Sequence, residues 1–342
     1  MDGTRSSYGA DSAGLICGYL LDPLGNREID TMEAAAWLAE QRATPARGAD
    51  AAFCWLHFNL AHTGAMPWLA EHADLSSEFF ELVRDGMHST RIERTEQALV
   101  AVVNDAHFDF NFEPADISTL WISVERHLVV TARQQPLRAV DKLREAVKAG
   151  QPLRSAAELF EHLLRAQADV LVEIVRGATE RVDAIEDQLL TRRLEHRRAR
   201  LGALRLLLVR LQRLLAPEPA SLFRLLQHPP RWMGETDVQE LRQANEEFSL
   251  VLRDMSTLEE RIKLLKEEIA AEVGESNNRS LFVLTMVTVL ALPINILAGL
   301  FGMNVGGIPL NQHPNGFWII VAIVVSFTVL AAWLTLRRRD QR

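Results

Sequence analysis

About the last 60 residues contain two uninterrupted apolar runs, each long enough to cross a lipid bilayer as a helix. The first run covers residues 281–301 and the second covers residues 317–336. A helix rises about 1.5 Å per residue, so about 20 residues span the roughly 30 Å of hydrocarbon in a bilayer. The residues before 281 are rich in charge. We therefore predict a large water-soluble part followed by a transmembrane hairpin over residues 281–342.

The charges around the two runs predict their orientation. Residues 304–316, between the runs, contain no Lys, Arg, Asp or Glu, whereas arginines stand at position 279 and at positions 337–339. Membrane proteins keep such basic residues on the cytoplasmic side. The N-terminus lacks the basic stretch and long apolar core of a signal peptide. We expect two membrane spans, with both termini in the cytoplasm and the loop between the spans outside.

The first 150 residues carry the pattern of a domain that mixes strands and helices. Residues 1–20 are rich in Gly and Ser, and we expect them to lack regular structure. Apolar or alternating stretches predict a sheet within about 40–150, and two short stretches between them predict helices. The strands are expected at 51–60, 98–103, 108–112, 119–124 and 127–131, and the helices at 66–72 and 76–84. The fold class is therefore an N-terminal cytoplasmic α/β domain over 1–150, followed by helices.

Helical patterning dominates from about residue 136 onwards. Residues 155–215 predict a helical hairpin or small bundle that Pro217 and Pro219 break, within a second domain over 151–280. A seven-residue repeat then precedes the membrane, which is typical of a coiled coil. Its members are Leu241, Phe248, Met255, Ile262 and Ile269, with Val251, Leu258 and Leu265 at the second position. One long stalk helix could run from about 237 to 301, although two helices that meet near Gly274 would also fit.

Polar residues in the first apolar run point to a water-filled path. Two helices per chain cannot enclose such a path, so several copies would have to surround one axis. An amide in hydrocarbon costs kilocalories unless it finds water or a partner, so Asn295 needs either a pore or a neighbouring helix. The polar and small residues at helical spacing are Asn278, Thr285, Thr288, Asn295, Gly299 and Gly302. The net charge of −8 argues against nucleic-acid binding as the main task.

The end of the first run carries a specific motif. Asn278-Arg279, Leu292-Pro293 and the string from Ala298 to Asn304 (Ala-Gly-Leu-Phe-Gly-Met-Asn), followed by a second apolar helix and a basic tail, resemble the CorA/ZntB family of divalent-metal transporters. The resemblance spans the whole architecture, but its specific motif lies within about 30 residues. It implies a funnel-shaped homopentamer with a central pore, no resident cofactor, and contacts with membrane lipid.

The resemblance also implies roles for individual residues. The Gly302-Met303-Asn304 motif would form the outer mouth, where the amide of Asn304 binds the water shell of an arriving cation. Asn278 matches an inner-mouth asparagine, and Asn295, with Thr288 and Gly299 on the same helix, would line the pore. Leu281, Leu284 and Leu292 fall at apolar constriction positions, where a pore can close by dewetting. Ordinary membrane packing is the alternative for each leucine.

The loop after the motif bears on which metal is carried. Val305-Gly306-Gly307-Ile308-Pro309 contains no carboxylate and resembles the zinc-transporting ZntB branch, whereas magnesium-type members usually continue with an acidic sequence. This implies proton-coupled uptake of Zn²⁺, with Cd²⁺, Co²⁺ and Ni²⁺ as further candidates. His313 could add a weak zinc-attracting ring, although a single solvated histidine is the simpler interpretation. The alternatives are a magnesium/cobalt channel and a membrane-anchored scaffold; no nucleophile–base pair indicates an enzyme.

Overall fold

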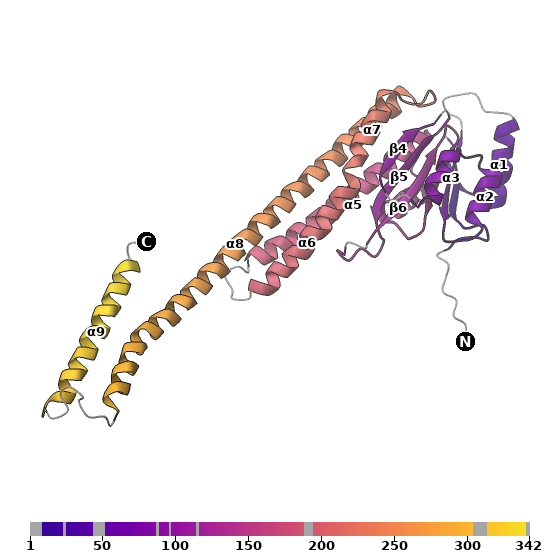
Figure 1. Cartoon of the computed structure of the whole chain (residues 1–342). Helices are drawn as coiled ribbons and strands as arrows, with labels where there is room; N and C mark the ends of the chain where they lie inside the picture. Colours follow the sequence, from indigo (N-terminus) through magenta and orange to yellow (C-terminus); the bar gives the residue numbers. More distant parts are fainter. Residues whose placement is uncertain are drawn as a thin grey trace, which may run out of the picture. The chain divides into compact units, whose positions relative to one another are not determined.

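The computed structural model describes residues 9–22, 25–43, 52–86, 89–95, 97–113, 116–187, 194–303 and 313–339 (Figure 1). The chain divides into two compact units, Met1–Lys266 and Glu267–Arg342. The first unit contains a mixed sheet and the helices around it. The second contains the last part of α8 (Glu235–Phe301) and α9 (Gly316–Arg339).

A seven-stranded sheet forms the centre of the first unit. Its order is β2-β1-β3-β7-β6-β5-β4; β3 and β7 are parallel and the other neighbours are antiparallel. Every residue of β5 and of β7 is buried, as expected for strands that are covered on both faces. The strands are β1 (Leu15–Asp22), β2 (Gly25–Glu28), β3 (Phe53–Asn59), β4 (Arg91–Arg94), β5 (Leu99–Ala106), β6 (Ile117–Val124) and β7 (Leu128–Arg133).

Helices cover both faces of this sheet, so the domain has three layers. One apolar core joins the sheet to α1 (Thr31–Ala43), α2 (Ala65–His72) and α3 (Ser77–Arg84). The other core joins it to α4 (Arg138–Lys148), α5 (Ala156–Glu186), α7 (Pro217–Gln227) and the start of α8. Figure 1 shows α1, α2 and α3 together on the side of the sheet away from α5.

The predicted strands at 51–60, 98–103, 119–124 and 127–131 are confirmed as β3, β5, β6 and β7, and the two short helices as α2 and α3. The expectation that residues 1–20 lack regular structure is wrong from Leu15 onwards, because β1 begins there. Gly18 lies within β1 and weakens the sequence pattern that would predict a strand there. Its backbone accepts a hydrogen bond from Ile29 N, and a Cβ at Gly18 would lie 2.7 Å from Ile29 O. Only glycine permits this close approach.

The predicted strand at 108–112 is also wrong. This segment is a loop, and the ring of Phe112 packs on α5. Phe112 has a positive φ of 63°, and its ring lies against Gly177, where an added Cβ would sit 2.8 Å from Phe112 Cζ. The guanidinium of Arg181 stacks over the same ring, 3.6 Å from its centroid. The alternation of aromatic residues therefore reflects docking of a loop.

This contact predicts opposite effects for two glycine substitutions in helices. Gly177→Ala is expected to lower the free energy of unfolding by about 1–2 kcal/mol, since the ring held by Arg181 must move. Gly202→Ala in α6 (Leu194–Leu215) meets only Lys266 Nζ at 3.9 Å, so it should stabilise the protein by about 0.5–1 kcal/mol. Thermal unfolding of both variants measures the difference. Equal shifts would contradict the packing described here.

The long helix is confirmed, since α8 runs without a break over 67 residues and passes Gly274. Its heptad seam is buried within the chain: Leu241, Phe248, Met255, Ile262 and Ile269 are all at most 3% exposed. Polar contacts tie α8 to α5 and α6, with Arg261 paired to Asp183 and Gln212 bonded to Ser256. Pro217 does more than end α6, because it begins α7. The domain boundaries at 150 and 280 stay predictions.

Candidate ion pathway

The apolar end of α8 carries the residues that were predicted to line a pore. Within the described part of the chain, α8 is the one helix long and apolar enough to cross a membrane, with a mean hydropathy of 2.4 over its best window. At about 100° per residue, the predicted residues fall within an arc of about 120° on its surface. They are Asn278, Leu281, Leu284, Thr288, Leu292, Asn295, Gly299, Gly302 and Met303. We call this arc the polar face of α8.

The second apolar helix lies beside a different face of α8. A groove of about 460 Å³ separates the two helices near the loop. From α8 it is lined by Ile294, Leu297, Ala298, Phe301 and Gly302, and from α9 by Phe317, Ile320, Val321, Val324 and Val325. Except for Gly302, these α8 residues lie on the half of the helix away from the polar face. In the single chain, Leu281, Leu284 and Leu292 are 57–64% exposed, and Asn278 and Asn295 are exposed as well.

Two backbone features mark the same segment of α8. Thr288 Oγ1 donates to Leu284 O at 2.9 Å, so its hydroxyl is already satisfied as a donor and retains lone pairs for an external donor. Pro293 lies inside α8 and has no N–H, so the carbonyl of Val289 lacks its usual helical partner. The hydroxyl of Thr288 can therefore face either lipid or water. The side-chain amide of Asn295 instead needs a polar partner from outside α8.

The outer end of α8 is described as far as Met303. Gly302 N donates to Ala298 O at 2.9 Å and closes the helix, and Met303 is half exposed. Asn304 and the loop to residue 312 lie outside the described residues, so the role of Asn304 stays a prediction. His313 Nδ1 accepts from Asn315 N at 3.2 Å, in the turn before α9. That bond uses the lone pair a metal would need, so it does not favour His313 as a ligand.

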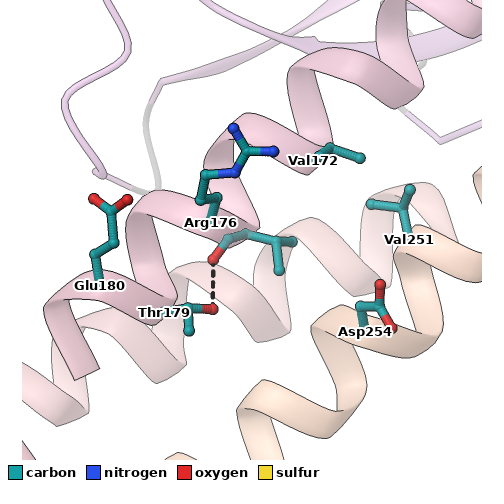
Figure 2. Close-up of a pocket in the computed structure, with 7 residues that line it drawn as sticks. Val172, Arg176, Thr179, Glu180, Val251 and Asp254 are labelled. Atoms are coloured by element: carbon teal, nitrogen blue, oxygen red, sulfur yellow. Dashed lines mark hydrogen bonds between the residues drawn. The ribbon is translucent and has the colours of Figure 1, made fainter. Parts of the chain in front are cut away.

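The first unit has a groove between α5 and α8 whose lining includes two carboxylates. It has a volume of about 280 Å³ and is lined by three valines with Arg176, Thr179, Glu180 and Asp254. Figure 2 shows Glu180 and Asp254 projecting from different helices, and Thr179 bonded to the carbonyl of Val175 at 2.8 Å. Among the residues that the structure describes, no group of three His, Cys, Asp or Glu side chains could hold a metal ion.

The acidic residues of α8 also form no such cluster. Glu259 pairs with Arg205 at 3.3 Å and Glu260 pairs with Lys263 at 3.1 Å. Glu267, Glu268, Glu272 and Glu275 are exposed to solvent.

Comparison with known proteins agrees with this architecture. Residues 50–338 match the model of the family described as CorA-like Mg²⁺ transporter protein, and the chain belongs to this family. It is a membrane transporter of divalent cations with a long apolar helix, not an enzyme. Members of the family are oligomeric.

Three relatives place the chain within the family. It is 27% identical to the divalent cation transporter CmaX of Pseudomonas aeruginosa, over 96% of this chain and 97% of that protein. It is 24% identical to the zinc transport protein ZntB of Yersinia enterocolitica, over 82% and 85%. A full-length CmaX structure superposes with a TM-score of 0.77 at 26% identity, covering 96% of this chain and 98% of that one. The magnesium transporter CorA of Methanocaldococcus jannaschii gives 0.75 at 18%, covering 93% and 96%.

These similarities confirm the predicted fold, an N-terminal α/β domain with a long helix that continues into an apolar segment. They also confirm the family that the Gly302-Met303-Asn304 motif indicated. The relatives differ in the metal that their names give, so the choice of cation belongs to the proposal that follows.

Proposed function

We propose that the chain is one subunit of a homopentamer that carries Zn²⁺ into the cytoplasm through a central pore in the inner membrane. The polar face of α8 lines this pore, and α9 separates it from lipid. Asn304 binds the hydrated cation at the outer mouth, Asn278 marks the inner mouth, and Leu281, Leu284 and Leu292 form the constriction. The arginines at positions 337–339, at the end of α9, hold the C-terminus in the cytoplasm.

One observation carries the choice of zinc: the loop that follows Met303 has no carboxylate. The sequence Val305-Gly306-Gly307-Ile308-Pro309 resembles the ZntB branch, and ZntB proteins are among the relatives. Zinc prefers nitrogen and sulfur ligands, yet residues 281–303 contain neither Cys nor His. Zinc therefore crosses at least partly hydrated, held by amide and carbonyl oxygens.

The membrane potential sets the direction. Moving a double positive charge inward gains roughly 4.6 kcal/mol per 100 mV of negative-inside potential. Uptake is downhill on this ground alone, and efflux would need an energy source. We include coupling to protons because of the resemblance to ZntB, although residues 281–303 contain no carboxylate that could carry one.

A magnesium or cobalt channel on the same scaffold is the second candidate. The matched family is described by its magnesium transporters, and the described residues contain no cluster that would select zinc. An oxygen-lined path is the kind of environment that Mg²⁺ tolerates.

Flux into proteoliposomes separates the two candidates. Purified protein is reconstituted, and uptake of labelled zinc, magnesium, cobalt, cadmium and nickel is measured for each cation alone and in competition with the others, with and without an acidic exterior. We expect zinc uptake to exceed magnesium uptake and to rise with the proton gradient; protein-free liposomes are the control. Preference for magnesium would overturn the choice of zinc, and absence of flux for all five cations would favour a scaffold.

A further inference from the structure

An acid pair is buried where α7 meets the sheet. Asp105 at the end of β5 and Glu218 in the first turn of α7 are 5% and 2% exposed, although they stand 113 positions apart in the sequence. Gln167 of α5 is also 2% exposed and connects Glu218 to the strand that carries Asp105. Its Nε2 donates to Glu218 Oε2 at 3.2 Å and to Asn104 O at 2.7 Å. The side chain of Gln167 therefore joins α5 to the backbone of β5 and to Glu218 of α7.

The two carboxyl groups have different surroundings. Asp105 Oδ1 accepts from Ala106 N at 2.8 Å, and its Oδ2 accepts from Ala139 N at 2.7 Å, at the start of α4. Two backbone donors and a helix N-terminus suit a charged carboxylate. Glu218 accepts only from Gln167, and its Oε1 has no donor. Gln167 Oε1 is also buried without a donor.

A proton on Glu218 supplies the donor that this site lacks. Protonated Glu218 and the amide of Gln167 can form a paired arrangement, in which the amide N–H donates to one carboxyl oxygen and the carboxyl O–H donates to the amide oxygen. Ionised Glu218 would instead leave a buried charge near a second carboxylate and an amide oxygen without a partner.

We propose that Glu218 binds a cytoplasmic proton and thereby locks α7 onto β5 and α5, so that this joint loosens when the proton leaves. The titration direction agrees with the geometry. Burial, opposed by the Gln167 hydrogen bond and reinforced by Asp105, raises the pKa of Glu218 from 4.5 to about 8. Burial raises the pKa of Asp105 from 3.8 to about 7, against the donors at Ala139 and Ala106.

The neighbouring elements supply little that would offset a charge on Glu218. Asp105 is its facing acid from β5, and Gln167 is its neutral partner from α5. From α4, Arg138 lowers and Asp141 raises the pKa of Asp105. From β4, Arg94 bonds to the carbonyl of His228, beyond the far end of α7. Glu218 lies in the first turn of α7, and this position favours its charged form. The effect is weaker than the opposing effect of burial.

The joint can influence the long helix through direct contacts. Asn245 Nδ2 of α8 donates to the carbonyl of Pro219 at 3.2 Å, one residue after Glu218. Arg242 of α8 donates to the carbonyl of Leu226 at 3.2 Å, at the other end of α7. A change in how firmly α7 is held therefore reaches the early turns of α8. The inference does not depend on which cation the protein carries.

The sign of the pH effect follows from the raised pKa. The stability that the protonated form contributes is fully present below about pH 4.5 and is lost as the pH rises through about 8. Protonation of Asp105 contributes to stability with the same sign, and this contribution is lost as the pH rises through about 7. Alkaline pH should therefore loosen α7, whereas acidic pH within the folded range should hold it.

Hydrogen–deuterium exchange of the full-length protein tests this joint. Peptides that cover residues 217–227 are followed between pH 6.5 and 9, with correction for the intrinsic pH dependence of exchange. We expect wild-type protection to fall at least ~10-fold across this range, which corresponds to a change of one pKa unit. Glu218→Gln, which keeps an amide donor for Gln167 Oε1, should abolish the part of the fall centred near pH 8 and leave only the part that Asp105 contributes near pH 7.

Two further variants keep the test decisive. Glu180→Gln removes an exposed carboxylate of α5 and should behave like the wild type. Asp105→Asn removes an acceptor of two backbone donors and should lower protection at every pH. Wild-type protection that is flat from pH 6.5 to 9, a Glu218→Gln variant that retains the fall near pH 8, or one that does not fold at pH 6.5 would each overturn the proposal.

Discussion

Asn304→Ala is expected to reduce cation uptake at least ~10-fold without changing the oligomeric state. Loss of a polar contact worth about 1 kcal/mol in each subunit of the proposed pentamer more than accounts for such a change. The amide offers a dipole to a hydrated ion without the grip of a carboxylate, and alanine offers nothing in its place. Tracer uptake into proteoliposomes, with size-exclusion chromatography of the same sample, measures both quantities.

Asn315→Ala is the matched control for Asn304. It removes a second asparagine near the start of α9 but keeps the backbone N–H that donates to His313. Its uptake should equal that of the wild type. If Asn304→Ala carried zinc at the wild-type rate, the outer mouth would have to be placed elsewhere on the chain.

Asn295→Leu is the second substitution with a large expected effect. If Asn295 faces water, leucine extends the apolar constriction beyond Leu292 and removes a polar group worth about 1–3 kcal/mol, so uptake should fall ~10-fold or more. The thermal stability of the oligomer should stay unchanged or rise. If a neighbouring helix satisfies Asn295 instead, leucine should lower stability and leave uptake nearly intact.

Ile294→Leu serves as its control. Ile294 lines the groove with α9, on the other half of the helix, and the substitution keeps both volume and polarity. Uptake by this variant should match the wild type. An equal loss of uptake in Ile294→Leu and Asn295→Leu would mean that the two faces of α8 do not differ in function.

The apolar part of the fold was predictable because hydrophobic length and periodicity are local signals. The run 281–301, the heptad from Leu241 to Ile269 and the buried strands β3, β5, β6 and β7 all follow from spacing alone. The family motif identified the candidate site for the same reason, since it lies in one short stretch. The choice of metal depends on a few residues of the loop after Met303, so the sequence supports it less strongly than it supports the family.

The missed features depend on contacts between distant segments. In the sequence, Gly18 argues against a strand, because no neighbouring residue indicates that Ile29 approaches it closely. The alternating phenylalanines from Phe108 to Phe112 predicted a strand. The residues that the Phe112 ring contacts, Gly177 and Arg181, lie far along the chain and give no local signal. The sequence does not single out Glu218, since only the folded chain buries it against Gln167.

Cysteine accessibility tests most directly whether the polar face of α8 is wet. The native thiols do not interfere, because Cys17 and Cys54 are buried and burial raises the pKa of each to about 12. Single cysteines at Thr288 and Asn295 are compared with cysteines at Ile294 and Leu297, using a charged methanethiosulfonate reagent on transporting proteoliposomes. We predict rapid labelling at 288 and 295 and little at 294 and 297. Equal labelling at all four positions, or protection of 288 and 295 alone, would contradict a water-filled cation pathway along this face.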